Sequence, residues 1–257
     1  MSAVGGEPGL PPAVTRLRAD NPSPLTLDGT NTWVVGRDPC WVVDPGPRLP
    51  EHLDAIVLAC EARGGCAGVL TTHAHADHVE ALEDVLRATG APHLRPADGE
   101  QAGPFTAVAT PGHAPDHLAF VTDGGACCTG DAVLGWGSVF VAPEPGALRS
   151  YLDALRRLRA MHLRILLPGH GPPVFDPAAK IDEYLAHRLE RERKLVAALD
   201  AGARTVDALL DAAWDDVPSQ LRPAAAVTLG SHLHKLAEDG ALPTGVQWPP
   251  GVASAGA

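Results

Sequence analysis

The 257-residue sequence predicts an α/β fold that carries a small helical module at its C-terminal end. Short apolar runs of strand length alternate with longer segments in which leucines recur at helical spacing. Several apolar runs end in a small-residue break followed by a polar residue, as buried strands do where an open α/β sheet binds its ligand. From Pro177 onward the pattern becomes almost entirely helical.

Eight strands and three helices are expected in the first part of the chain. The strands are expected near residues 14–17, 32–35, 41–43, 68–71, 107–109, 118–121, 126–128 and 165–167. The helices are expected over residues 50–63, 79–88 and 146–161. Asp38-Pro39 and Asp123-Gly124-Gly125 are turn sequences, so each is expected to join the two strands of a hairpin.

The C-terminal part is expected to form a compact module of short helices that resembles a degenerate winged helix. Its helices are expected over residues 182–199, 206–210 and 223–238. The first has an apolar stripe at Leu185, Leu189 and Leu195. A residual strand is expected at Ala241-Leu242. We therefore predict a catalytic domain over residues 13–198 and a winged-helix-like module over residues 199–250.

The charge of this module argues against the reading of DNA. From Lys180 to the end there are eight Lys and Arg residues against eleven Asp and Glu residues. Recognition helices of DNA-binding proteins are basic, so a lid, a packing module or a homodimer contact is favoured. Arg188, Arg191 and Arg193 are expected to form solvated salt bridges along their helix rather than to meet phosphates.

Seven side chains in the first part are placed to hold metal ions. The densest segment is the H-x-H-x-D-H string of residues 73–78, which follows an apolar run. His113, Asp131 and His170 each follow a separate apolar run and a small-residue break. A single histidine after a strand is most often an ordinary surface or core residue. The string together with three further polar residues, each after its own strand, makes coincidence a poor explanation.

These residue types suit a pair of ions of the zinc class. Neutral imidazole binds zinc, and a carboxylate can bridge two ions; iron and manganese accept the same ligands. A workable assignment gives one ion to His73, His75 and His113 and the second to Asp77, His78 and His170, with Asp131 bridging both. Two such ions lower the pKa of a shared water, so a serine or cysteine nucleophile is not required.

Two further residues are assigned roles near the ions. Asp77 is the candidate catalytic residue, because its carboxylate would orient the attacking hydroxide or carry its proton. His117 lies four residues after His113 and is a candidate for supporting a ligand from behind or for donating a proton. The other histidines are expected to be structural.

The order of these motifs resembles that of the metallo-β-lactamase superfamily. The matching fragments are Thr72 to His78, Pro111-Gly112-His113, Gly130-Asp131, Pro168 to Gly171 and the early Val42 to Gly46. The resemblance implies an αβ/βα sandwich with the metals at one edge. It also implies that Asp44 hydrogen-bonds to metal ligands from behind. The presence of both His78 and Asp131 resembles the glyoxalase II, lactonase and RNA-processing branches, whereas many antibiotic-degrading members have cysteine in place of the bridging aspartate.

A narrower resemblance covers most of the chain, from Asn21 to Leu242. The segment Asn21 to Trp33 is similar to the opening of the β-lactamase-like protein 2 branch, which is endoribonuclease-like. Leu134 to Gly137 and the His187-Arg188 pair also match that branch. The connection at 99–104 is shorter than the branch usually has, so the edge of the substrate cleft is expected to be trimmed.

Composition limits the cellular setting. The content of 45% hydrophobic and 20% charged residues is that of an ordinary globular enzyme. Neither a secretion signal nor an apolar run near the ~20 residues of a membrane span is recognisable, so a cytoplasmic protein is expected. Five cysteines, an odd number, are expected to be reduced core residues rather than disulfides.

The leading functional hypothesis is a hydrolase with two metal ions, zinc or else iron or manganese. Single-stranded RNA is the substrate that the branch resemblance favours. A small acyl substrate, namely a thioester or a lactone, is favoured by the net charge of −11, since polyanion binders usually carry a basic footprint. β-Lactam hydrolysis is the least favoured activity. The alternative of another class is a non-catalytic nucleic-acid-binding or scaffold protein that has kept the fold.

Overall fold

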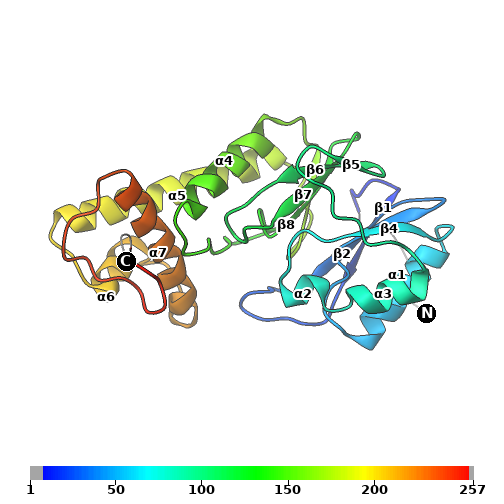
Figure 1. The fold of residues 1–257 in the computed structure, drawn as a ribbon, viewed down its shortest axis with the longest axis horizontal. Helices are drawn as coiled ribbons and strands as arrows, with labels where there is room; N and C mark the ends of the chain where they lie inside the picture. The colour runs from blue at the N-terminus through cyan, green and yellow to red at the C-terminus, as the bar shows by residue number, and fades with distance from the viewer. Residues whose placement is uncertain (1–7, 255–257) are drawn as a thin grey trace. The chain divides into compact units, whose positions relative to one another are not determined.

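The computed structural model describes residues 8–254, which form two compact units (Figure 1). The first unit contains the described residues up to Thr110 together with Asp116–Gly137 and Met161–Pro177. The second contains Pro111–Pro115, Ser138–Ala160 and the described residues from Ala178 onward. The domain boundary predicted between residues 198 and 199 stays a prediction.

The first unit contains two sheets with the same plan, in which antiparallel strands are followed by one parallel strand. The first sheet has the order β1 (Val14–Arg18), β2 (Asn31–Gly36), β3 (Cys40–Val43) and β4 (Cys66–Leu70). The second has the order β5 (Gln101–Ala102), β6 (Phe105–Ala109), β7 (Leu118–Thr122), β8 (Ala126–Gly130) and β9 (Ile165–Pro168). The pairs β3–β4 and β8–β9 are parallel, and the other pairs are antiparallel.

Alternating side chains build a layered core in this unit. In β2, Trp33 and Val35 join Phe105, Phe120 and other residues of the second sheet in one buried cluster. Val34, between them, belongs instead to a cluster with residues of α1 (Pro50–Glu61) and α3 (Leu82–Thr89). Because neighbouring residues of a strand point to opposite faces, one sequence run serves both layers. The first sheet therefore has the second sheet on one face and helices on the other.

Two elements of the first unit differ from the expectation. The predicted helix over residues 79–88 is two helices, α2 (Ala76–Val79) and α3. The carbonyl of His78 accepts a hydrogen bond from Gly46 N at 2.9 Å instead of one from the next turn of helix, so the helical hydrogen bonds of α2 end there. The short strand β5 lies in the connection predicted to be trimmed, where it pairs with β6. Each of the eight predicted strands is present, with ends that differ by a few residues.

The second unit is helical. It contains α4 (Ala147–Ala160), most of α5 (Pro177–Asp200), α6 (Val206–Ala213), the 3-10 turn η1 (Ser219–Leu221) and α7 (Arg222–Glu238). Leu195, Leu209, Leu229 and Leu233 are among the fully buried residues of its core. The predicted strand at Ala241-Leu242 is absent from this segment, which has no regular secondary structure.

The buried face of α5 differs from the predicted stripe. Leu189 is 49% exposed, whereas Arg188 and Arg191 are buried. The guanidinium of Arg188 donates to Val139 O and lies over the Tyr151 ring, 5.4 Å from its centroid. The prediction of solvated arginines therefore holds for Arg193 but is wrong for the other two. The buried positions of this face are 184, 188, 191 and 195, so the predicted stripe is right at Leu195 and one position off at Leu185 and Leu189.

Among the described residues, no helix is both long enough and apolar enough to cross a membrane.

Candidate metal centre

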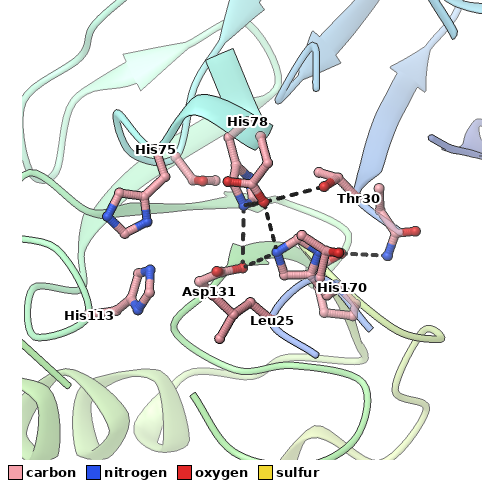
Figure 2. A network of polar contacts seen from close by, with 12 residues as sticks. Leu25, Thr30, His75, His78, His113, Asp131 and His170 are labelled. Atoms are coloured by element: carbon pink, nitrogen blue, oxygen red, sulfur yellow. Dashed lines mark hydrogen bonds and ion pairs between the residues drawn. The ribbon is translucent and has the colours of Figure 1, made fainter. Parts of the chain in front are cut away.

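Three chain segments of the first unit bring predicted ligands to the ends of parallel strands. The chain leaves β4 at Leu70 and reaches His73 and His75, after which α2 carries Asp77 and His78. Asp131 directly follows β8 and His170 follows β9 by two residues. Figure 2 shows the side chains of His75, His78, Asp131 and His170 gathered around one region. The ends of parallel strands meet at the same sheet edge, which explains this convergence.

The ligand atoms in this cluster are separated by similar short distances. His78 Nε2 lies 3.5 Å from Asp77 Oδ2 and 3.5 Å from Asp131 Oδ1. His170 Nε2 lies 3.2 Å from the same Asp77 oxygen and 3.4 Å from the same Asp131 oxygen. His73 Nε2 lies 2.9 Å from His75 Nδ1. Within the first unit, two groups have ligand atoms that all lie within 4.8 Å of one another, close enough to share an ion. One group is Asp77, His78 and His170, and the other is His73, His78 and Asp131.

These separations fit metal ligation better than direct hydrogen bonding. Two ligand atoms about 2.1 Å from one ion at a tetrahedral angle are about 3.4 Å apart, given usual zinc bond lengths. The four nitrogen–oxygen distances of His78 and His170 lie between 3.2 and 3.5 Å. His78 Nε2 is also buried without a hydrogen-bond partner, which is costly unless an ion engages it. The residues present therefore fit a metal ion.

The ring orientation of three of these histidines is set through Nδ1, the nitrogen on the side away from the cluster. His78 Nδ1 lies 2.9 Å from Asp44 Oδ2, and His170 Nδ1 lies 3.2 Å from the carbonyl of Gly29. His73 Nδ1 lies 3.0 Å from Thr72 Oγ1. A nitrogen facing an acceptor carries the proton, so in each neutral ring the lone pair is at Nε2, toward the cluster.

His113 belongs to the second unit, in the segment Pro111–Pro115. Its Nδ1 lies 3.1 Å from the carbonyl of Phe140 in that unit, which again puts the lone pair at Nε2. The segment is tethered by chain connection to Thr110 and Asp116 of the first unit. The role of His113 as a metal ligand stays a prediction.

Asp44 organises the back of the cluster. Its buried carboxylate accepts from Thr72 N at 2.7 Å, from Thr72 Oγ1 at 2.8 Å and from His78 Nδ1 at 2.9 Å. Because the Thr72 hydroxyl donates to Asp44, it accepts from His73 Nδ1, so one carboxylate orients two histidines. Asp44 has φ of 55°, in the left-handed region that a short polar side chain tolerates better than most.

His117 supports Asp131 through the backbone. Its Nε2 accepts a hydrogen bond from Asp131 N at 3.1 Å, so the proton lies on Nδ1, which is 2.7 Å from Thr110 Oγ1. The ring also stacks on His73 with centroids 4.9 Å apart. With its proton donated to Thr110, His117 is placed to position Asp131 rather than to donate a proton to substrate.

The electrostatics of the cluster favour positive charge near the two carboxylates. Burial lowers the pKa of His170, but Asp131 and Asp77 outweigh it and raise that pKa to about 9. Burial raises the pKa of Asp77, but the hydrogen bond with His170 and the charge of His78 lower it to about 2. Burial and the neighbouring His78 and His117 lower the pKa of His73 to about 2. In the absence of an ion, protons on His78 and His170 balance the carboxylates.

Several residues that the motifs did not single out hold the cluster in place. Thr30 Oγ1 donates to Asp77 Oδ2 at 3.3 Å, the dashed line drawn from Thr30 in Figure 2. Asn21 fixes Thr30 through two hydrogen bonds of 2.9 and 3.0 Å. The amide of Asn31 donates to the carbonyls of Pro168 and Gly171, on either side of His170. The signal was present in the Asn21 to Trp33 segment, which resembled a family branch but suggested no role.

Two glycines are required by close approach. A Cβ on Gly169 would lie 2.6 Å from Asp131 Oδ1 and 2.7 Å from His78 Cε1. Gly130 has φ of 46°, and a Cβ there would lie 2.5 Å from Thr72 Oγ1. A larger residue at either position would push on side chains of the cluster.

Sequence comparisons identify the family. Residues 25–104 match the metallo-beta-lactamase superfamily, and residues 205–242 match the beta-lactamase associated winged helix domain. The lactamase-like protein adaB of Aspergillus niger is 32% identical over 261 residues, covering 88% of this chain and 80% of that protein. The chain belongs to the metallo-β-lactamase superfamily. The family and the winged-helix module predicted from the motifs are therefore confirmed.

Other relatives in the metallo-β-lactamase superfamily have more specific names. The atrochrysone carboxyl ACP thioesterase nsrC of Aspergillus novofumigatus is 31% identical, covering 94% of this chain and 84% of that protein. A beta-lactamase-like protein 2 homolog of Caenorhabditis elegans is 28% identical, covering 91% and 87%. This chain is accordingly a hydrolase of the metal-dependent superfamily.

Solved structures agree with this fold. A metallo-beta-lactamase family protein from Thermus thermophilus is similar with a TM-score of 0.67 and 25% identity, covering 89% of this chain and 94% of that one. TTHA1623, solved in a di-iron-bound form, has a TM-score of 0.53 and 26% identity, covering 63% of this chain and 95% of its own.

Proposed function

We propose that this protein is a dinuclear metal hydrolase that cleaves acyl thioesters. The observation that carries the metal part is the set of four separations of 3.2–3.5 Å between the imidazole nitrogens of His78 and His170 and the carboxylates of Asp77 and Asp131, which suits a first ion. The pair His73 and His75, with its nitrogens 2.9 Å apart, supplies ligands for a second ion. We assign His113 to that second ion and Asp131 to the bridge between the two.

Two bound ions would supply a water of lowered pKa as nucleophile and would polarise the scissile carbonyl. Zinc is the proposed metal, and iron is the alternative, because TTHA1623 was solved with two irons. The protein contributes orientation. Thr30 holds one oxygen of Asp77, whose carboxylate accepts the proton of the attacking water, while Asp44 and His117 fix the surrounding ligands.

A thioester substrate is supported by relatives and by charge. The thioesterase nsrC is similar over 94% of this chain. Residues 205–242 contain two basic side chains, Arg222 and Lys235, and both form ion pairs within the second unit. Arg222 lies 2.8 Å from Asp211, and Lys235 lies 2.8 Å from Glu192 and from Asp239. A module with its cations already paired is poorly suited to phosphate contacts.

Single-stranded RNA is the second candidate substrate. It is supported by the similarity to beta-lactamase-like protein 2 homologs over 91% of this chain and by the winged-helix match. The same nucleophile would then attack phosphorus instead of a carbonyl carbon.

The test combines metal analysis with a substrate panel. Purified protein is analysed for metal by mass spectrometry and assayed on acyl-pantetheine thioesters, a lactone and a short single-stranded RNA. We expect two ions per chain and release of thiol from the thioester. Asp131→Asn is expected to lower both metal content and thioester turnover, the latter by roughly 100-fold or more. Asp123→Asn, an exposed change in the turn between β7 and β8, serves as control.

The outcomes separate the proposals. Cleavage of RNA but not of thioester would replace the substrate and leave the metal centre standing. A single ion per chain at full activity would overturn the dinuclear assignment. A folded, metal-free protein inactive on the whole panel, even after reconstitution with zinc or iron, would overturn the hydrolase proposal.

A further inference from the structure

Three thiols lie together at the end of the first sheet opposite the metal cluster. Cys40 begins β3, Cys66 begins β4, and Cys60 lies in the last turn of α1. The same two strands end at Val43 and Leu70, next to Asp44 and the H-x-H-x-D-H string. The thiols are therefore separated from the metal cluster by the length of the strands.

The three thiols differ in access to solvent. Cys40 and Cys60 are buried in the cluster that α1 shares with the first sheet, and Cys66 at its border is partly exposed. Cys40 Sγ donates to the carbonyl of Gly65 at 3.2 Å. Cys66 Sγ donates to the carbonyl of Gly68, two residues along the same strand, at 3.4 Å. Cys66 is therefore the thiol best placed to react from solution.

The geometry of the strands suits a bond between two of these sulfurs. Cys40 and Cys66 are partners in the parallel register of β3 and β4. Neighbouring strands lie about 4.8 Å apart, which is within the range of Cα separations of about 4.4–6.8 Å found in disulfides. A disulfide between them needs little movement of the backbone.

We propose that Cys66 is an oxidative modification site at which a peroxide produces a reversible Cys40–Cys66 disulfide. The Cys66 thiolate attacks hydrogen peroxide and breaks its O–O bond, giving a sulfenic acid and hydroxide, which takes up the thiol proton as water. The Cys40 sulfur then attacks the Cys66 sulfur, and the S–O bond breaks. The departing hydroxide takes the Cys40 proton and leaves as a second water. Two electrons from the two thiols reduce one peroxide.

The remaining two cysteines provide an internal reference of low reactivity against which Cys66 is compared. Cys127 and Cys128 are adjacent in β8 and fully buried. Burial raises the pKa of Cys127 to about 12, so it is a poor nucleophile. Adjacent residues of a strand point to opposite faces, which keeps these two sulfurs apart.

Peptide mapping tests the proposal directly. Trypsin separates the three thiols, because Cys40 falls in peptide 38–48, Cys60 in 49–63 and Cys66 in 64–87. Folded protein is treated with hydrogen peroxide, its remaining thiols are blocked with N-ethylmaleimide in denaturant, and the non-reduced digest is analysed by mass spectrometry. We expect peptides 38–48 and 64–87 joined, and separated again by a phosphine reductant. Without peroxide, we expect maleimide to label Cys66 about tenfold or more faster than Cys127.

Two variants and a metal analysis complete the test. Cys66→Ser is expected to abolish the cross-link, and Cys60→Ser, as matched control, is expected to keep it. Metal content measured before and after oxidation checks that the effect is confined to the thiols. A cross-link between 38–48 and 49–63 instead, over-oxidation without a cross-link, or oxidation of Cys127 as fast as Cys66 would each overturn the proposal.

Discussion

A small set of hydrogen bonds behind the ligands determines what the metal cluster is able to bind. Thr72 is the central residue of this set, because its hydroxyl donates to Asp44 and accepts from His73. Asp44 in turn holds His78. Ligand rings whose tautomer and orientation are fixed before the ion arrives bind it more tightly than rings that must be ordered on binding.

Thr72→Val is therefore expected to weaken zinc binding. The valine keeps the shape of threonine but removes the hydroxyl, so the proton position on His73 is no longer fixed. We expect an affinity roughly 10–100-fold lower, measured by competition with a chromogenic chelator. Thr71→Val is the matched control, since the neighbouring hydroxyl lies 3.1 Å from Nε2 of His93 instead. Equal losses in the two variants would contradict this role for Thr72.

The candidate metal ligands were predictable from sequence, whereas most of the residues that hydrogen-bond to them were not. His73, Asp131 and His170 each follow an apolar run, and the end of a strand is a position that sequence pattern locates well. Thr72 and Thr30 have no such pattern. Their roles depend on which residues of distant segments approach them, and on the left-handed backbone of Asp44.

At the scale of single elements, strand β2 both pairs within the first sheet and holds the loop that contains His170. Its first residue, Asn31, donates to the carbonyls of Pro168 at 2.9 Å and Gly171 at 2.8 Å. Trp33 Nε1 adds a third bond, also to Pro168. The loop with His170 is thus held to the first sheet by side chains rather than by strand pairing alone.

Asn31→Ala is expected to destabilise the protein and to displace His170. Two buried carbonyls each lose one donor, at a cost of about 1–3 kcal/mol in the free energy of unfolding. Pro168 O keeps its bond from Trp33 and Gly171 O keeps its bond from Arg16. Gln101→Ala removes an exposed amide hydrogen bond to Thr106 and is expected to cost less than about 1 kcal/mol. Urea denaturation of both variants measures the difference, and a loss for Asn31→Ala no larger than for the control would contradict the pinning role.

Helix α5 offers a second comparison within one element. Buried Arg191 donates to Ala213 O and to Asp216 and lies over the Trp214 ring. We expect Arg191→Met to lower the free energy of unfolding by about 2–3 kcal/mol. Arg193→Met, at an exposed position of the same helix, is expected to leave it unchanged. Equal urea midpoints for the two variants would show that Arg191 is as dispensable as a surface arginine.

The sequence predicted where the helices lie along the chain better than it predicted which face of each helix is buried. The leucine spacing of α5 indicated a helix correctly but placed Leu189 inside, where arginines are found instead. Apolar periodicity cannot identify a buried arginine, because its guanidinium is satisfied by carbonyls and rings from other segments. Similarly, the break between α2 and α3 follows from a hydrogen bond of Gly46, thirty-odd positions earlier.

At the scale of the whole molecule, metal binding and stability are linked through protons. In the metal-free protein the pKa of His170 is raised from 6.5 to about 9. Its contribution to stability is fully present below pH 6.5 and is lost as the pH rises through 9. The pKa of Asp77 is lowered from 3.8 to about 2, so its contribution is present above pH 3.8 and is lost as the pH falls through 2.

The stabilisation by metal is accordingly expected to grow between pH 6 and pH 9. Ligation needs neutral imidazoles, so protons compete with the ion at the lower end of this range. The measurement is the difference in melting temperature between metal-loaded protein and chelator-dialysed protein across that range. A difference that is constant or shrinks with rising pH would mean that His170 does not exchange a proton for an ion.

The carboxylate of Asp44 accepts hydrogen bonds from Thr72 and His78 at the same time. The substitutions tolerated at position 72 therefore depend on the residue at position 44. Once Asp44 has been replaced, the Thr72 hydroxyl has lost its acceptor, so a second change at Thr72 should cost less than the same change alone. Asp44 still holds His78 after Thr72 has been replaced. Saturation mutagenesis of the two positions together should thus yield strongly non-additive fitness effects, with tolerated pairs that neither single change would suggest.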